Sequence, residues 1–414
     1  MNYKDNKALA FYGLPQEVKF CTKCVISNQR PSSDVEFRSK KETKKNVINF
    51  DEKNVCSACQ YSIEKEKIDW KIREEKLIDL CKKIKKDNNG KNYDCIIPGS
   101  GGKDSAFTAH ILKYKYGLNP LTVTWAPHLY TDIGWKNFQN WSNIGGLNNI
   151  LFTPNGKLHR LLTKLSFQNL LHPFQPFIIG QRLIGPVIAD KFNINYIFYG
   201  ENQAEYGNNI EENYKETMEK KFYSDHSENI FFGGVSKKEI IKTYKFKNED
   251  FLPYEPLKNV KQNDKTQVHY LGYYLKWDPQ ECYYYAAENT GFKTNTERTE
   301  GSYSKYSSID DKIDPFHYYT TLIKFGIGRA TYDSSQEIRN NKISREEGVN
   351  LVKLFDHEFP KKYFKDFLNY IDLSEEQFFE TIDKFRSPHL WTKDSNNNWK
   401  LRHNVSKTGT DDIN

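Results

Sequence analysis

The sequence predicts an α/β fold built on an open, doubly wound parallel sheet. Between about residues 61 and 235, short apolar runs alternate with longer segments of helical pattern. This order is typical of repeated strand–helix–strand units, whose crossovers keep neighbouring strands parallel. One apolar run, Cys95–Ile97, is soon followed by the small residues of Gly99–Gly102. Such residues allow a tight turn between a buried strand and a helix.

The predicted elements start with a charged helix at about 69–87. The helix after the small residues begins near Lys103, and Gly117 fits its end because glycine adopts the left-handed conformation without strain. A further helix, at about 181–192, precedes the last strand. The strands of the predicted sheet are Asp94–Pro98, Leu121–Trp125, Asn149–Thr153 and Tyr196–Tyr199.

Composition divides the chain into three parts. Residues 1–60 are rich in Cys, Lys and turn residues, and we predict that they form a zinc-ribbon region. Residues 61–235 hold the predicted α/β domain. Residues 236–414 are predicted to be mainly helical, and we expect this region to contact the substrate or a partner.

The bulk composition argues against several classes of protein. The chain has 414 residues and a formal net charge of +7, which suits acidic or phosphorylated substrates and is modest for nucleic-acid binding. It holds no apolar stretch near the ~20 residues that a membrane span needs. No signal peptide is visible, and seven cysteines do not suggest a disulfide framework. We therefore expect a cytoplasmic protein without membrane contact.

The segment Gly99–Ser105 has the pattern of a phosphate-binding loop. Small residues leave backbone N–H groups free to surround an anion, and the N-terminus of the following helix adds partial positive charge. Lys103 supplies a cation, and Asp104 is a candidate Mg²⁺ ligand. The loop is not a Walker A motif, which has Ser or Thr directly after the lysine. The predicted nucleotide-binding residues are Gly99, Ser100, Gly101, Gly102, Lys103, Asp104 and Ser105.

Ligands of open parallel sheets bind at the carboxyl ends of the strands. Thr124 and Trp125 end the second predicted strand, although Trp125 could equally belong to the core. Gly200, Glu201 and Asn202 follow the fourth strand; Glu201 is the leading candidate for a catalytic or metal-binding carboxylate, and Asn202 is next. The roles of five further residues stay open: Glu205, Arg182, Arg298, His317 and Arg329.

Two Cys-x-x-Cys pairs, Cys21 with Cys24 and Cys56 with Cys59, lie in the N-terminal part. Two such turns bring four thiolates together around a tetrahedral Zn²⁺. A site with four protein ligands has no open position, so we expect it to support folding rather than catalysis. The alternatives are that one pair is incidental or that a pair has a redox role. We expect the three isolated cysteines to be buried bystanders: Cys81, Cys95 and Cys282.

The chain resembles a known family at several of these motifs. Ser100–Ser105 reads Ser-Gly-Gly-Lys-Asp-Ser, similar to the PP-loop of N-type ATP pyrophosphatases, which cleave ATP between the α and β phosphates. Together with the cysteine pairs and the helical C-terminal region, the chain resembles the N-acetyl sugar amidotransferases of bacterial surface-polysaccharide and nonulosonic-acid biosynthesis. The segments that carry this resemblance are Cys21–Val25, Arg30–Pro31, Val55–Cys59, Gly99–Ser105, Trp277–Pro279, Glu288–Phe292, Lys324–Ala330 and Ile343–Glu347.

The resemblance implies a PP-loop type of α/β fold and conversion of a sugar acetamido group to an acetamidino group. In that reaction AMP is transferred to the amide oxygen, and ammonia then displaces AMP. The implied cofactors are ATP, Mg²⁺ and a structural Zn²⁺. The implied catalytic residues are Lys103, Asp104, Glu201 and Asn202, and further ATP contacts are expected at Thr124, Trp125 and Gly200.

None of the cysteines has the setting of a glutaminase nucleophile, so we expect ammonia to come from solution or from a separate partner. The resemblance implies a glutaminase of the imidazole-glycerol-phosphate-synthase type. The sugar itself stays open: a free nonulosonic acid, its CMP form and a UDP-linked uronic acid all suit the charge. The products would enter a lipopolysaccharide O-antigen, a capsule or a flagellin glycan.

Two other classes of function remain. A tRNA-modifying PP-loop enzyme, such as a thiolase, also combines zinc knuckles with this loop, but commonly needs extra active-site cysteines. A non-catalytic zinc- and nucleotide-binding assembly module would bind ATP without releasing AMP and pyrophosphate.

Overall fold

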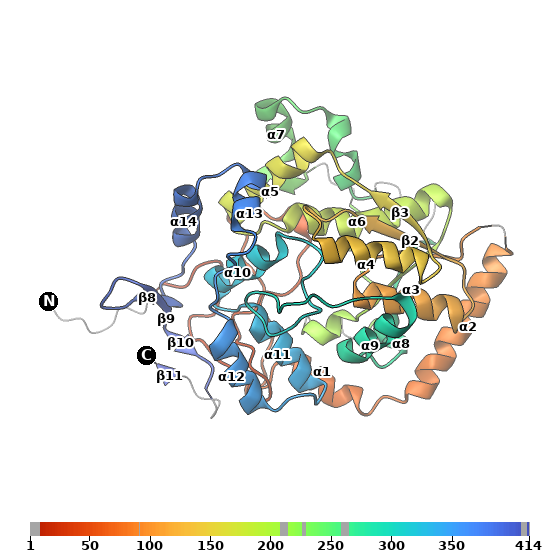
Figure 1. Ribbon diagram of the computed structural model, residues 1–414, viewed down its shortest axis with the longest axis horizontal. Helices are drawn as coiled ribbons and strands as arrows, with labels where there is room; N and C mark the ends of the chain where they lie inside the picture. Colours follow the sequence, from red (N-terminus) through yellow and green to blue (C-terminus); the bar gives the residue numbers. More distant parts are fainter. Residues whose placement is uncertain are drawn as a thin grey trace.

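The computed structural model describes residues 9–90, 92–207, 214–225, 229–257 and 265–406, and the backbone of 412–413 (Figure 1). Its centre is a five-stranded sheet in the order β3-β2-β1-β4-β7. The strands are β1 (Cys95–Pro98), β2 (Pro120–Trp125), β3 (Asn148–Phe152), β4 (Tyr196–Tyr199) and β7 (Gln267–Tyr270). All four pairings between them are parallel. The predicted parallel α/β sheet is therefore confirmed.

Helices cover both faces of this sheet because successive side chains of a strand point to opposite sides. Ile96 of β1 packs with α5 (Gly156–Leu170) and α6 (Gln175–Phe192) in the larger hydrophobic core. Its neighbours Cys95 and Ile97 pack on the other face, in a second core. The helices that contribute to that second core include α2 (Trp70–Asn88), α3 (Lys103–Tyr114) and α9 (Pro279–Thr290).

Two features of the sheet differ from the sequence prediction. A fifth strand, β7, pairs with β4 along Tyr196–Tyr199, although it lies in the region predicted to be mainly helical. Its segment, Gln-Val-His-Tyr, is too short and too polar to show a strand pattern in the sequence. Helix α6 begins at Gln175 rather than near 181, and it has a proline in its first turn. A proline is tolerated there because the N–H groups of the first turn have no hydrogen-bond acceptor within the helix.

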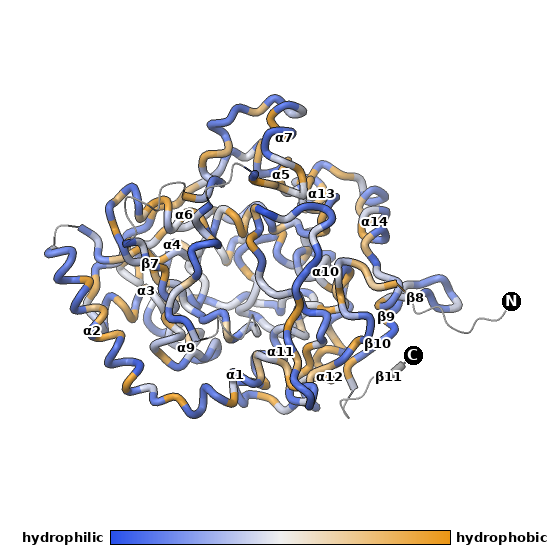
Figure 2. Tube along the Cα trace, turned by 180° about the vertical axis from the view of Figure 1, so that it is seen from behind, coloured by the Kyte–Doolittle hydropathy of each residue, from blue (hydrophilic) through white to orange (hydrophobic). Residues whose placement is uncertain are grey.

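The remaining elements lie outside the sheet. The helices are α1 (Ser57–Lys65), α4 (Asp132–Asn143), α7 (Lys237–Tyr244), α8 (Leu271–Tyr274), α10 (Asp314–Phe325), α11 (Arg329–Arg339), α12 (Arg345–Phe355), α13 (Phe364–Ile371) and α14 (Glu375–Lys384). The short 3₁₀ helices are η1 (Glu36–Arg38), η2 (Gln203–Tyr206), η4 (Lys220–Phe222) and η5 (Asn248–Tyr254). The small antiparallel pairs are β5 (Phe231–Phe232) with β6 (Val235–Ser236), β8 (Trp391–Lys393) with β9 (Trp399–Leu401), and β10 (His403–Asn404) with β11 (Asp412–Ile413). Figure 2 shows the turn between β8 and β9 as hydrophilic.

The N-terminal region packs against the C-terminal helices rather than forming a separate body. Its cysteines share a hydrophobic cluster with Ile327, which lies between α10 and α11. The guanidinium of Arg345, in α12, donates to the backbone oxygens of Cys21 and Cys24. Among the described residues, no helix is long and apolar enough to cross a membrane.

Candidate functional site

The Gly99–Ser105 loop joins β1 to α3 at the carboxyl edge of the sheet. Gly101 has a φ of +83°, and a Cβ at this position would lie 2.9 Å from the Cα of Phe138, so only glycine fits without strain. Gly102 precedes α3, and no side chain caps that helix. The N–H groups of its first turn therefore stay available for an anion.

Lys103 and Asp104 form an ion pair, with 2.5 Å between Nζ and Oδ2. Burial opposes the charge of Lys103, but Asp104 and Glu201 outweigh it and raise the pKa of the amine. The other carboxylate oxygen of Asp104, Oδ1, is buried and has no hydrogen-bond partner among the described residues. A carboxylate oxygen in this state suits a cation that arrives with phosphate groups.

Glu201 follows β4 and lines the same two cavities as Asp104. Its carboxylate accepts a hydrogen bond from the hydroxyl of Tyr206. Burial and the charge of Asp104 raise the pKa of Glu201, while Lys103 acts in the opposite direction. Two carboxylates that repel each other beside a phosphate loop fit a Mg²⁺ ion, which takes oxygen ligands and would remove the repulsion.

The first of the two shared cavities, the cradle cavity, has a volume of about 320 Å³. It opens at the carboxyl ends of β1, β4 and β7. Its lining residues are Ile97, Pro98, Gly99, Ser100, Gly102, Asp104, Ser105, Thr108, Gln181, Arg182, Tyr199, Gly200, Glu201, Met218 and Tyr270. A Cβ on Gly200 would lie 2.7 Å from the indole ring of Trp277, so a glycine is needed at this edge.

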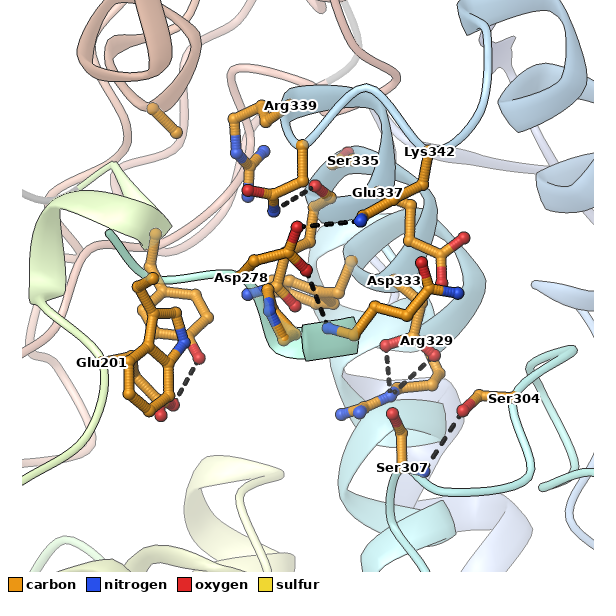
Figure 3. Close-up of a pocket in the computed structure, with 18 of the residues that line it drawn as sticks. Glu201, Asp278, Ser304, Ser307, Arg329, Asp333, Ser335, Glu337, Arg339 and Lys342 are labelled. Atoms are coloured by element: carbon orange, nitrogen blue, oxygen red, sulfur yellow. Dashed lines mark hydrogen bonds and ion pairs between the residues drawn. The ribbon is translucent and has the colours of Figure 1, made fainter. Parts of the chain in front are cut away.

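The second shared cavity, the polar cavity, has a volume of about 230 Å³ (Figure 3). Its walls come from the N-terminal region, the sheet edge and the C-terminal helices. The polar and charged residues that line it are Arg30, Lys103, Asp104, Glu201, Tyr206, Asp278, Gln280, Ser304, Tyr306, Ser307, Tyr318, Arg329, Tyr332, Asp333, Ser335, Gln336, Glu337, Arg339, Asn340 and Lys342. Figure 3 shows Glu201 on one side of the drawn residues and Asp278, Arg329 and Asp333 on the other.

Several charges of the polar cavity are paired within its wall. Arg329 contacts Asp333 at 3.0 Å, and Lys342 contacts Asp278 at 3.1 Å. Arg30 is 9% exposed and its Nη1 has no hydrogen-bond partner among the described residues. Arg339 donates one hydrogen bond to the backbone oxygen of Glu205, while its Nε is buried and without a partner in the described part of the chain. The cavity therefore offers two guanidinium groups with unused donors.

The four cysteines of the two Cys-x-x-Cys pairs lie together and are all buried. Their sulfur atoms are within 4.8 Å of one another; Cys21 and Cys59 are 3.8 Å apart, and Cys24 and Cys56 are 3.7 Å apart. Tetrahedral zinc with Zn–S bonds of about 2.3 Å separates its sulfurs by roughly 3.8 Å. The predicted cluster is confirmed, and its geometry fits a Zn²⁺ ion.

Not every predicted site residue reaches these cavities. Thr124 is completely buried and accepts a hydrogen bond from Asn149. Trp125 is 2% exposed, and its indole lies so close to Gly180 that a Cβ there would be 2.2 Å from the ring. The structure thus places both side chains in the core of the sheet. Asn202 is also fully buried, and its side chain accepts a hydrogen bond from the N–H of Ala204, which orders the turn after Glu201.

Of the five residues whose roles the sequence leaves open, two form ion pairs and three line cavities. Glu205 is 3% exposed and pairs with Lys65 at 2.6 Å, and Arg298 makes two contacts with Glu358; both are structural pairs. Arg329 lines the polar cavity. Arg182 and His317 line a third cavity, and Arg182 also lines the cradle cavity.

The residues predicted from the sequence leave out much of the wall of the polar cavity. Arg30 and Asp278 lie in segments that carried the family resemblance, so that signal could have indicated them. Tyr206, Arg339 and Lys342 have no local signal, because they reach the cavity only through the packing of distant segments. The three isolated cysteines are buried as expected.

A C-terminal segment that supplies part of the wall of the polar cavity is similar to a known family. Residues 300–405 match the family described as "LPS biosynthesis protein WbpG-like, C-terminal domain". This match supports a surface-polysaccharide biosynthesis family. The WbpG-like segment contains α10 to α14 and contributes Ser304, Arg329 and Asp333 to the cavity.

A relative of unassigned function also shares part of the sequence. Over 79 residues the chain is 35% identical to the uncharacterized protein MJ1599 of Methanocaldococcus jannaschii. The similarity covers 19% of this chain and 27% of the relative, so the chain matches about a quarter of the length of that protein.

Proposed function

We propose that the protein is an ATP-dependent amidotransferase that converts the N-acetyl group of a sugar to an acetamidino group during surface-polysaccharide biosynthesis. The observation that carries the proposal is the position of Asp104 and Glu201, which line both the cradle cavity and the polar cavity. A nucleotide in the first cavity would present its α-phosphate to a substrate in the second. The WbpG-like segment supports the assignment to surface polysaccharides.

The polar cavity suits a sugar because hydroxyl, amide and charged side chains all line it. A sugar satisfies such groups with its own hydroxyls, whereas an apolar ligand would leave them without partners. Arg30 and Arg339 add donors for an acidic group on the sugar. A nucleotide sugar or a nonulosonic acid fits this description.

The proposed reaction has two steps. The amide oxygen forms a bond to the α-phosphorus of ATP, the bond from that phosphorus to the β-phosphate oxygen breaks, and pyrophosphate leaves. The lone pair of ammonia then adds to the imidate carbon, a nitrogen-bound proton is lost, and AMP leaves with the electrons of the C–O bond. The products are the amidine, AMP and pyrophosphate.

The residues of the site fit this chemistry. The N–H groups around Gly101 and Gly102, with Lys103, would hold the departing pyrophosphate and balance its charge. Asp104 and Glu201 would hold Mg²⁺, which when bound neutralises phosphate charge. The four-cysteine cluster would hold a structural Zn²⁺, and ammonia would come from solution or a separate glutaminase.

The sulfur-transfer alternative depends on a cysteine at the site. Cys282 is near enough for Asp104 and Lys103 to influence it, but it is 2% exposed. Burial, helped by Asp104, raises the pKa of its thiol well above the usual range. A buried, protonated thiol is a poor sulfur carrier because the thiolate is the reactive form. We therefore expect Cys282→Ala to retain AMP formation, whereas a sulfur-transfer enzyme would lose activity.

The proposal is tested by incubating the protein with ATP, Mg²⁺, ammonium and a panel of N-acetylated sugar acids and nucleotide sugars. We expect AMP and pyrophosphate in equal amounts, and a product in which mass spectrometry shows O replaced by NH. Lys103→Ala and Asp104→Ala should abolish both. Lys136→Ala, an exposed lysine on the neighbouring helix α4, is the matched control and should keep full activity. Release of ADP in place of AMP would refute the mechanism.

A further inference from the structure

A third cavity, the basic cavity, has no part in the proposed reaction. Its volume is about 220 Å³, and it lies between residues 31–45, the turn from α5 to α6, and α10. Its lining cations are Lys40, Lys41, Lys45, Arg182 and Lys324. Glu36 is the acidic residue among the described residues that line it.

The nearby acids offset only part of this positive charge. Lys45 pairs with Asp34, with 2.6 Å between Nζ and Oδ2. Glu36 lies 3.6 Å from His172, and the charges of His172 and Lys45 outweigh burial and lower the pKa of Glu36 to about 2. These two contacts account for the carboxylates of Asp34 and Glu36, and they leave Lys40, Lys41 and Arg182 as further basic side chains of the lining. The excess positive charge favours an anion.

Lys324 is the most deeply placed of these cations. It is 7% exposed, donates to the backbone oxygen of Leu170 at 2.7 Å, and lies 4.6 Å from the ring centre of Tyr12. Burial and the charge of Lys45 lower the pKa of Lys324 to about 7. The described residues give it no carboxylate partner. An anion beside this amine would supply the missing counter-charge.

Arg182 connects the basic cavity with the site of the proposed reaction. It lines both the basic cavity and the cradle cavity. Its guanidinium donates to the backbone oxygen of Asp34 at 3.2 Å, which leaves further donors for a ligand. An anion that leaves the cradle cavity beside Arg182 would therefore enter the basic cavity.

We propose that the basic cavity is a second anion site that binds a phosphoryl group, held by Lys41, Lys45, Arg182 and Lys324. Multiply charged phosphoryl oxygens match several convergent cations better than a single carboxylate does. The site goes beyond the proposed function, which needs only the cradle cavity. Its phosphoryl group would come either from pyrophosphate released in the cradle or from a phosphate ester on the substrate.

Equilibrium dialysis with labelled pyrophosphate and with UMP distinguishes the two sources. In the Lys103→Ala background, which weakens the cradle, a pyrophosphate source predicts one remaining pyrophosphate site per chain. A phosphate-ester source predicts that UMP occupies this site and pyrophosphate does not. In either case Lys41→Gln and Lys324→Met should each weaken binding about tenfold, as expected for loss of a charge-assisted contact.

The exposed Lys41 keeps the test valid if the Lys324 variant fails to fold, and Lys353→Gln, an exposed lysine of α12 outside the cavity, is the matched control. Binding of neither probe, or binding that these two substitutions leave unchanged, would overturn the proposal. Cleavage of ATP by the otherwise wild-type Lys41→Gln variant reports separately on the proposed function.

Discussion

The buried ion pair between Lys65 and Glu205 offers a quantitative test of how the N-terminal region supports the candidate site. Lys65 ends α1, and its Nζ lies 2.6 Å from Glu205 Oε1. The same amine donates to the backbone oxygen of Trp277, next to Asp278 of the polar cavity. One side chain therefore ties three segments together around the cavity.

Lys65→Met removes one partner and leaves the carboxylate of Glu205 buried. Both side chains are 3% exposed, so solvent does not screen the charge that remains. Breaking a buried pair in this way costs about 3–5 kcal/mol, against a total stability of about 5–15 kcal/mol for a typical domain. In the double variant Lys65→Met/Glu205→Leu no buried charge is left, so most of this loss should be recovered.

Urea unfolding followed by circular dichroism measures these differences. The control is Lys82→Met, because Lys82 pairs with Asp79 on the surface with exposures of 72% and 76%; this change should cost less than about 0.5 kcal/mol. A loss below about 1 kcal/mol for Lys65→Met, or a double variant no more stable than the single one, would show that this ion pair does not stabilise the protein as proposed.

Three further predictions concern the loop, the cysteine cluster and pH. Gly101→Ala should weaken ATP binding, measured by calorimetry, at least tenfold, because the φ of +83° and the 2.9 Å approach of a Cβ to Phe138 Cα exclude a side chain. The control is Gly102→Ala, which should bind ATP nearly normally, since its Cβ would meet Ser100 Oγ at 3.6 Å. Cys56→Ser should lose the bound zinc, measured by atomic absorption, and should lower the midpoint temperature of unfolding. The control is Cys81→Ser, which lies outside the cluster and should retain zinc. Burial raises the pKa of Asp314 from 3.8 to about 7, against the influence of Arg329. The folded state therefore holds a proton that the unfolded state releases, and this stabilisation is lost as the pH rises through about 7. Asp314→Asn should accordingly gain thermal stability relative to wild type between pH 5 and pH 8, and an unchanged difference across that range would contradict the assignment.

The parts of the fold that the sequence predicts are those with local signals. The apolar run of β1, the small residues after it and the start of α3 are adjacent in the chain, so their pattern is visible without tertiary structure. Each cysteine pair is likewise a local motif, and a tetrahedral Zn²⁺ with four ligands predicts that the two pairs come together.

The rest depends on packing between distant segments. Strand β7 is held by its pairing with β4 rather than by its own pattern. Trp125 ends a strand at the expected edge, but the absence of a side chain at Gly180 lets its ring enter the core. Arg30 and Arg339 both line the polar cavity although they are far apart in the chain, so no sequence window contains both.

In the proposed reaction, the oxygen of a sugar amide attacks the α-phosphate of ATP where the cradle and polar cavities meet. The most direct measurement uses an N-acetylated substrate whose amide carbonyl carries ¹⁸O, with the released phosphates examined by mass spectrometry. We expect the label in the phosphate of AMP and not in pyrophosphate. Unlabelled AMP, or label found in inorganic phosphate, would contradict it.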